Sequence, residues 1–199
     1  MTLYMRDMAF MMMYMLPVYC AGRILVIRRK LFAEKKSFEM SLKTGAREVV
    51  MALFVLFMAG LLMLTFQNGQ ELMRARNLTE AVLRFRNRVG VNLTPFHTIR
   101  NYIKYAPTSD WLWVNIVGNI VMFIPWGFCL PLLWKEYRSF FKLAFMALFL
   151  PVCIEFFQLF VGRTVDVDDV ILNFAGSMLG GVLFLIARVL VPKIGRLAK

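Results

Sequence analysis

The sequence predicts an all-α fold, a polytopic transmembrane helical bundle with five spans. Hydrophobic residues make up 60% of the 199 residues, and the mean hydropathy is +0.64. Charged residues make up only 18% and leave several windows free that are long enough to cross a bilayer. The net charge of +12 is typical, in a membrane protein, of anchoring at the inner leaflet. Without a nucleic-acid motif, this charge does not indicate a nucleic-acid-binding protein.

The first predicted span covers residues 8–27 and contains Pro17 and Gly22, which membrane helices tolerate. We expect an uncleaved anchor, because the basic cluster follows the apolar run, whereas a signal peptide carries it in front. The other four spans are predicted to begin at 46 or 49 and end at 66, and to cover 111–134, about 140–161, and 166–191. Cys20, Cys129 and Cys153 lie in apolar windows, which favours small buried side chains over disulfides or metal ligands.

The loops predict the domain organisation and the orientation. Residues 1–48 form an N-terminal anchor and a basic cytoplasmic loop, residues 49–191 a membrane domain with an outer loop at 67–110, and residues 192–199 a basic cytoplasmic tail. Loops 28–48 and 67–110 each carry seven basic and three acidic residues, so neither decides the orientation. The turn at 135–142 and the tail are basic, whereas 162–169 is net acidic. The positive-inside rule therefore predicts an outer N-terminus and a cytoplasmic C-terminus.

Polar residues interrupt the apolar sequence between Ile154 and Gly181. If a helix begins at Asp166, then Asp169, Asn173 and the small residues that follow share one stripe, and Asp168 falls on the other side. Polar residues near the predicted outer ends of the third and fourth spans reach the same depth: Asn115, Asn119, Glu155 and Gln158. We therefore expect three helices to place their polar groups in the outer half of the membrane.

Each of these residues also has a structural interpretation. The amides are as often hydrogen-bonded contacts between helices as ligand groups, and the glycines are more often packing residues. Asp166 and Asp168 could be solvated, or could cap the fifth helix. Glu155 and Asp169 favour a function more strongly, because a carboxylate within a span costs about 2.5–3.5 kcal/mol. The non-functional alternative is a salt bridge from Arg163 to Asp166 or Asp169.

The predicted outer loop carries alternating arginines, Arg84, Arg86 and Arg88, with apolar residues between them. This alternation predicts an extended or surface-lying segment, and such charge runs are usually solvated. At the outer leaflet the arginines could also bind the phosphate or carboxylate of a lipid-linked ligand. His97, the single histidine, is expected to be a loop residue.

Several separate motifs in the second half of the chain carry a resemblance. They are NLTPF at 92–96, NIVGNIVMFIPWG at 115–127, EFFQ at 155–158, Arg163, DVDD at 166–169 and NFAG at 173–176. In this order and spacing, from about Arg84 to Gly180, the chain resembles the bacterial VanZ-like family. The resemblance implies a small integral protein of the bacterial cell membrane, with a four-helix core to which the first span is an addition. The family's founding members confer low-level resistance to teicoplanin, which implies a phenotype and leaves the mechanism open.

Three hypotheses of function follow. The first is a membrane protein that reduces susceptibility to teicoplanin-type lipoglycopeptides through an outer-leaflet polar cavity, which binds the lipid-tailed drug, a lipid-linked cell-wall precursor or a partner in wall synthesis. The second is a membrane enzyme acting on a lipid-linked substrate, with Glu155 and Asp169 as general acid and base; a variant holds a divalent metal through Glu155, Asp166, Asp169 and Asn173. The third is a proton-coupled transporter, for which five spans without repeats are a poor basis unless the chain forms a homodimer.

The candidate site residues combine these arguments with the resemblance. Glu155 and Asp169 are the catalytic residues if the protein is an enzyme. The predicted ligand-binding residues are Arg88, Asn92, Asn115, Asn119, Gln158, Arg163, Asp166 and Asn173. We expect membrane lipid as a partner and no nucleic acid, and the sequence predicts neither a cofactor nor a resident metal.

Overall fold

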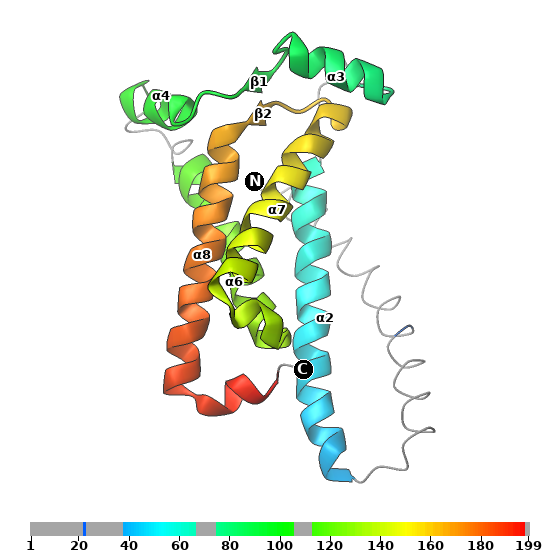
Figure 1. Ribbon diagram of the computed structural model, residues 1–199, viewed down its shortest axis with the longest axis vertical. Helices are drawn as coiled ribbons and strands as arrows, with labels where there is room; N and C mark the ends of the chain where they lie inside the picture. The colour runs from blue at the N-terminus through cyan, green and yellow to red at the C-terminus, as the bar shows by residue number, and fades with distance from the viewer. Residues whose placement is uncertain (1–21, 23–37, 67–74, 106–112, 198–199) are drawn as a thin grey trace.

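The computed structural model describes residue 22 and residues 38–66, 75–105 and 113–197, and these ranges form an almost entirely helical bundle (Figure 1). The long helices are α2 (Phe38–Phe66), α6 (Gly118–Leu133), α7 (Phe140–Val161) and α8 (Val167–Leu190). The shorter elements are α3 (Leu78–Arg86), β1 (Val91–Asn92), α4 (His97–Tyr105), the π-helix η2 (Trp113–Val117), η3 (Lys135–Arg138), β2 (Val165–Asp166) and η4 (Pro192–Arg196).

Four helices are long and apolar enough to cross a membrane: Ala46–Phe66, Asn115–Leu133, Phe140–Val161 and Val167–Leu190. They agree with the last four predicted spans to within a few residues, so the all-α membrane-bundle prediction is confirmed. The first predicted span, 8–27, lies outside the described residues apart from Gly22, and a total of five spans stays a prediction.

The closest helix pair in the bundle is α6 with α8, and it depends on glycine. A Cβ atom added to Gly176 would lie 2.1 Å from the carbonyl oxygen of Ile120, and one added to Gly180 would lie 2.1 Å from that of Ile124. From the other helix, a Cβ on Gly127 would lie 1.7 Å from the Ser177 carbonyl oxygen. The two backbones therefore touch, as is common where small residues face each other in membrane helices. The packing interpretation of Gly176 and Gly180 is correct.

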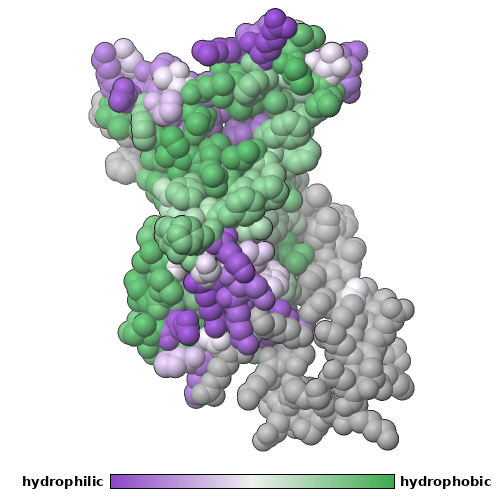
Figure 2. Space-filling view, in the orientation of Figure 1, coloured by the Kyte–Doolittle hydropathy of each residue, from purple (hydrophilic) through white to green (hydrophobic). Residues whose placement is uncertain are grey.

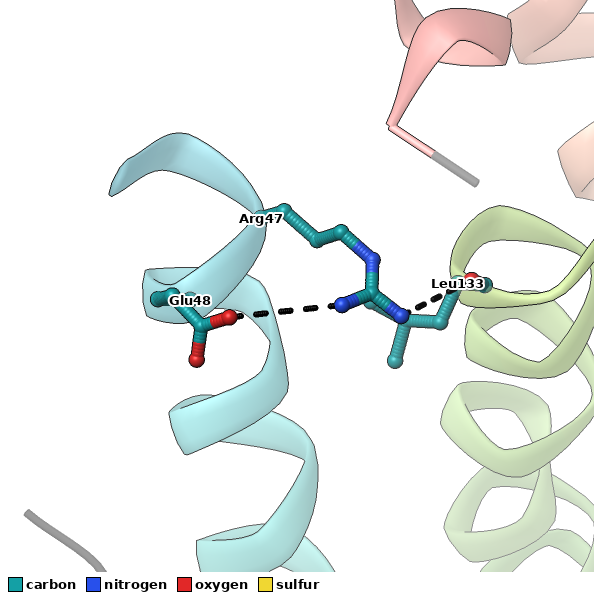
Figure 3. A network of polar contacts seen from close by, with 3 residues as sticks. All are labelled: Arg47, Glu48 and Leu133. Carbon is teal, nitrogen blue, oxygen red and sulfur yellow. Dashed lines mark hydrogen bonds and ion pairs between the residues drawn. The ribbon is translucent and has the colours of Figure 1, made fainter. Parts of the chain in front are cut away.

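Arginines satisfy the backbone at the end of α6. Arg47 of α2 is buried, and its Nη2 donates to the carbonyl oxygen of Leu133 at 3.4 Å, while its Nη1 lies 4.0 Å from the Glu48 carboxylate (Figure 3). Arg138 donates to the carbonyl oxygens of Pro131 at 3.1 Å and of Gly195 at 2.7 Å. Burial, together with the nearby charge of Arg188, lowers the pKa of Arg138. These contacts join α2, α6 and η4 at one end of the bundle, here named the far end.

Apolar side chains cover the flanks of the bundle between its two ends. The surface is largely apolar along the spans, and hydrophilic residues gather near the two ends (Figure 2). Phe141 on α7 is 81% exposed and Val189 on α8 is 79% exposed. Such exposure is expected of side chains that face lipid, which is as apolar as the side chains themselves.

We predict that Gly180→Ala destabilises the protein and that Gly118→Ala does not. The added methyl group at Gly180 would overlap the backbone of α6, whereas an added Cβ at Gly118 meets nothing within 4 Å. Forcing α6 and α8 apart should cost about 1–3 kcal/mol. Thermal unfolding of both variants in the same detergent measures the difference. Equal melting temperatures for the two variants would contradict direct packing of the two backbones.

Candidate functional site

The segment 75–105, here named the cap segment, lies across the end of the bundle at which α7 connects to α8 (Figure 1). It contains two short helices, α3 and α4, joined through β1. The two residues of β1 pair in parallel with β2, with Val91 opposite Val165 and Asn92 opposite Asp166. The predicted surface-lying segment is therefore a pair of helices fixed to the α7–α8 connection, and this end of the bundle is named the cap end.

Asp168 holds the start of α4. Its side chain is only 1% exposed, and its carboxylate accepts hydrogen bonds from the backbone N–H groups of Phe96 at 2.5 Å, Thr98 at 2.8 Å and Ile99 at 3.1 Å. These groups lie at the helix N-terminus, where backbone donors have no partner within the helix and a negative charge is favourable. Phe96 has a positive φ of 62° in the tight turn that brings these groups together.

Asp166 is the N-cap residue of α8 and lies outside the helix. Its backbone is extended, and its carboxylate accepts from the N–H of Asp168 at 2.9 Å, so the capping interpretation is confirmed. The same carboxylate accepts from the side-chain amide of Asn92 at 3.0 Å and from the hydroxyl of Thr98. The prediction that a helical stripe begins at Asp166 is wrong in this detail, because the helix begins one residue later.

Arg84 donates hydrogen bonds to backbone carbonyl groups at the C-terminal end of α7. Its Nη1 donates to the carbonyl oxygens of Leu159 at 2.7 Å and Gln158 at 3.4 Å, and its Nη2 donates to that of Arg163. Burial lowers the pKa of Arg84. The guanidinium thus satisfies the last carbonyls of α7 and fixes α3 above them. By contrast, Arg88 is exposed in the turn after α3, with a positive φ of 54°.

Glu155 is buried within α7, and its carboxylate is bonded within the protein. It accepts the backbone N–H of Asp166 at 2.9 Å. In the amide orientation that satisfies both ends of Gln158, the side-chain nitrogen donates to the Glu155 carboxylate at 3.1 Å and to the carbonyl oxygen of Thr164 at 3.0 Å. The two predicted residues of α7 therefore bind the connection between α7 and α8.

Asp169 and Asn119 join α8 to α6. The Asn119 side-chain nitrogen donates to the Asp169 carboxylate at 2.8 Å. Tyr102 of α4 lies close to the same acid: burial, and then the charges of Asp169 and Asp166, raise the pKa of its hydroxyl. That hydroxyl is consequently a protonated donor at neutral pH. Arg163 lies within electrostatic range of Asp169 and donates to the carbonyl oxygen of Leu64 at 3.3 Å.

Asn173 lies one turn deeper on α8 and is 4% exposed. Its side-chain oxygen is buried without a hydrogen-bond partner in the part of the chain that the structure describes. An unsatisfied buried acceptor costs about 1–3 kcal/mol, so it is a feature that needs a reason. Asn115, predicted with this group, is partly buried in the π-helix that leads into α6.

A pocket of about 400 Å³ lies beside this hydrogen-bonded network, between α3, α7 and α8. Its lining is Leu78, Ala81, Val82, Phe85, Leu93, Val152, Glu155, Phe156, Leu159, Val165, Asp166, Val167 and Val170. Only Glu155 and Asp166 among these are charged, and their oxygens accept the hydrogen bonds described above. The sequence predicts a polar cavity, whereas the pocket at the cap end is lined almost entirely by hydrocarbon.

The structure thus brings most of the predicted site residues together at the cap end. One hydrogen-bonded network contains Glu155, Gln158, Asp166 and Asn92. A second contact nearby joins Asn119 of α6 to Asp169 in the first turn of α8. Within the described ranges, no three side chains of His, Cys, Asp or Glu are placed to hold a metal ion.

Three residues of this site are missing from the sequence-based list: Asp168, Arg84 and Tyr102. Helical periodicity sets Asp168 apart from Asp169, and α4, the partner of Asp168, comes from a distant part of the chain. The alternation of Arg84 with Arg86 and Arg88 gives no sign that only Arg84 is buried. The acidic N-terminus of α8 was the available signal for Asp168, since it is typical of helix capping.

We predict that Asp168→Ala releases α4 while leaving the spans folded. Losing the acceptor for three backbone N–H groups should cost on the order of 2 kcal/mol, equivalent to roughly 30-fold less protection of these amides from hydrogen exchange. Hydrogen exchange of residues 96–105 measures this effect, with Glu136→Ala at the exposed far end as the control. Unchanged protection in Asp168→Ala would contradict the capping role.

We predict that Arg84→Ala lowers the melting temperature far more than Arg86→Ala does. Arg84 is 7% exposed and donates to two carbonyl groups in the last turn of α7 and to that of Arg163 just beyond it, whereas Arg86 is exposed two residues later on the same helix. Removing charged hydrogen bonds to a buried helix end should cost about 2–3 kcal/mol. Thermal unfolding in detergent compares the two, and similar melting temperatures would show that Arg84 is dispensable.

Comparison with known proteins identifies the family of this chain. The family model described as VanZ/LLP1 matches residues 49–188, well over half of the chain. No curated protein and no solved structure matches the sequence. The matched range begins at Val49 in α2, ends at Arg188 in α8, and includes the cap segment and the network at the cap end. The chain belongs to the VanZ-like family of membrane proteins.

Proposed function

We propose that this protein reduces the susceptibility of a bacterial cell to teicoplanin-type lipoglycopeptides by binding a lipid-linked or amphiphilic ligand at its cap end. The observation that carries the proposal is the pairing of an apolar pocket with a hydrogen-bonded polar network on one end of the bundle. An amphiphile needs both kinds of surface within one molecular length. The family's association with teicoplanin supports a ligand that lies at the cell surface.

In this proposal the cap end faces the outside of the cell membrane. The cap segment comes from the 67–110 loop, which the positive-inside rule places outside. Basic residues of the opposite end, Lys135, Arg138, Lys142 and Lys193, lie on η3, η4 and the start of α7, where they would face the cytoplasm. The last described helix, η4, lies at that far end as well (Figure 1).

Asp169 is the residue to test. Asp166 and Asp168 hold the cap segment, and Glu155 holds the α7–α8 connection, so substitutions there would disturb the fold. Asparagine at position 169 can retain the contact with Asn119, because the Asn119 nitrogen can donate to an amide oxygen as it does to the carboxylate. Asp169→Asn therefore removes the charge and preserves the shape.

We predict that expression of the protein lowers binding of fluorescent teicoplanin to bacterial cells, and that Asp169→Asn restores most of that binding. Vancomycin serves as the drug without a lipid tail, and its binding should not change. At matched protein levels in the membrane, a reduction of about tenfold corresponds to roughly 1.4 kcal/mol of apparent affinity. Glu136→Gln, an exposed carboxylate at the far end, is the matched control and should behave as wild type.

Equal teicoplanin labelling of cells with and without the protein would reject the proposed function. Protection that survives Asp169→Asn would assign the effect to the pocket and the cap segment and remove any role for the acid in proton transfer. Protection that is lost only in Asp169→Asn, together with a chemically altered surface lipid in wild-type cells, would favour the enzyme hypothesis instead.

A further inference from the structure

We propose that the pocket between α3, α7 and α8 is a binding site for one acyl chain of a lipid from the surrounding bilayer. This inference goes beyond the proposed function, because it concerns the membrane's own lipid and holds whether or not a drug is the physiological ligand. It rests on the position, lining and size of the pocket.

The depth of the pocket along α7 is about the thickness of one leaflet of the hydrocarbon core. Its wall on α7 runs from Leu159 to Val152, about 10 Å at 1.5 Å per residue. Val152 is nine residues from the end of α7 at Val161, so the pocket reaches roughly 14 Å into the span. Half of a hydrocarbon core is about 15 Å thick, and the pocket therefore occupies the depth of a single leaflet.

The mouth of the pocket opens among side chains that face lipid. Val152 and Phe156 of α7 are 48% and 46% exposed, and Val82 and Phe85 of α3, in the cap segment, are also exposed. In a membrane, this opening faces hydrocarbon. Because the opening is continuous with the lipid-facing surface, a lipid chain can enter sideways without crossing a polar layer.

The chemistry of the lining selects a hydrocarbon chain over a polar occupant. Glu155 and Asp166 are the only charged side chains of the lining, and each accepts hydrogen bonds from the protein itself. A peptide segment entering the pocket would bring backbone N–H and carbonyl groups into an apolar space with few hydrogen-bond partners. Each unsatisfied group would cost several kcal/mol. Water is disfavoured as well, because an apolar lining offers it few hydrogen-bond partners.

The size of the pocket favours a narrow chain over a helix of a second copy as the occupant. One turn of an α-helix, about 10 Å wide and 5.4 Å long, already fills roughly 400 Å³, the whole volume of the pocket. A spanning helix could therefore cover the mouth without filling the interior. A flexible acyl chain is narrower and can follow the groove under α3. The pocket thus fits a chain, with the lipid headgroup left outside near the exposed arginines of the cap segment.

The test uses the full-length protein in nanodiscs of phosphatidylcholine, with a tracer phosphatidylcholine that carries a photoreactive diazirine at the end of one palmitoyl chain. After illumination, adducts are mapped to peptides by mass spectrometry. We expect adducts on residues 78–85, 152–159 and 165–170 to exceed those on the equally lipid-facing stretch 140–149 of α7. No drug is present, so the outcome is independent of whether the proposed function is correct.

Two matched variants decide the assignment. Val152→Trp fills the pocket from its mouth, whereas Val182→Trp adds the same bulk at a valine of α8 that is also 48% exposed but lies outside the pocket. We expect Val152→Trp to lower pocket adducts at least about fivefold and Val182→Trp to leave them unchanged. Val82→Trp, which fills the pocket from the side of α3, should have the same effect as Val152→Trp. Adducts spread evenly over the exposed faces, or pocket adducts that neither filling variant lowers, would overturn the proposal.

Discussion

The arrangement of the cap end depends on two carboxylates at the start of α8. Asp166 and Asp168 accept hydrogen bonds from three sources: the first turn of α8, the start of α4, and the side chains of Asn92 and Thr98. One short acidic segment therefore begins a membrane span and holds a second helix above it. Since both carboxylates act on unpaired N–H groups at helix N-termini, their negative charge is stabilised where it lies.

Arginines provide the complementary solution at helix C-termini. Arg84 serves the carbonyl groups at the end of α7, and at the opposite end of the bundle Arg47 and Arg138 serve carbonyl groups of α6. A backbone carbonyl near the hydrocarbon layer cannot rely on water, so a buried donor with several N–H groups is favourable there. Part of the high basic content thus stabilises the fold and does not belong to a ligand site.

The same hydrogen bonds decide the character of the pocket. Glu155 and Asp166 line the space between α3, α7 and α8, but their oxygens accept hydrogen bonds from Gln158, from backbone N–H groups and from the cap segment. What remains to line that space is hydrocarbon. Asp169 lies beside Asn119 and Tyr102. Unlike Glu155, Asp166 and Asp168, it does not hold a backbone segment of the described residues in place, so it is the acid that we consider for a functional role. A polar patch and an apolar pocket consequently lie side by side at the cap end.

Reading the amino-acid sequence alone was enough to predict the class of fold, four of the spans, the family and the cluster of polar residues at one end of the bundle. These follow from hydropathy and local spacing, which depend only on neighbours along the chain. The roles of individual charged residues depend on contacts between distant segments: Asp168 accepts hydrogen bonds from α4 across some 70 residues, and Arg84 donates to α7 across about 75. The tertiary structure also decided that the pocket is apolar, because whether a carboxylate faces a cavity or a backbone N–H depends on contacts between distant segments, and helical periodicity carries no information about them.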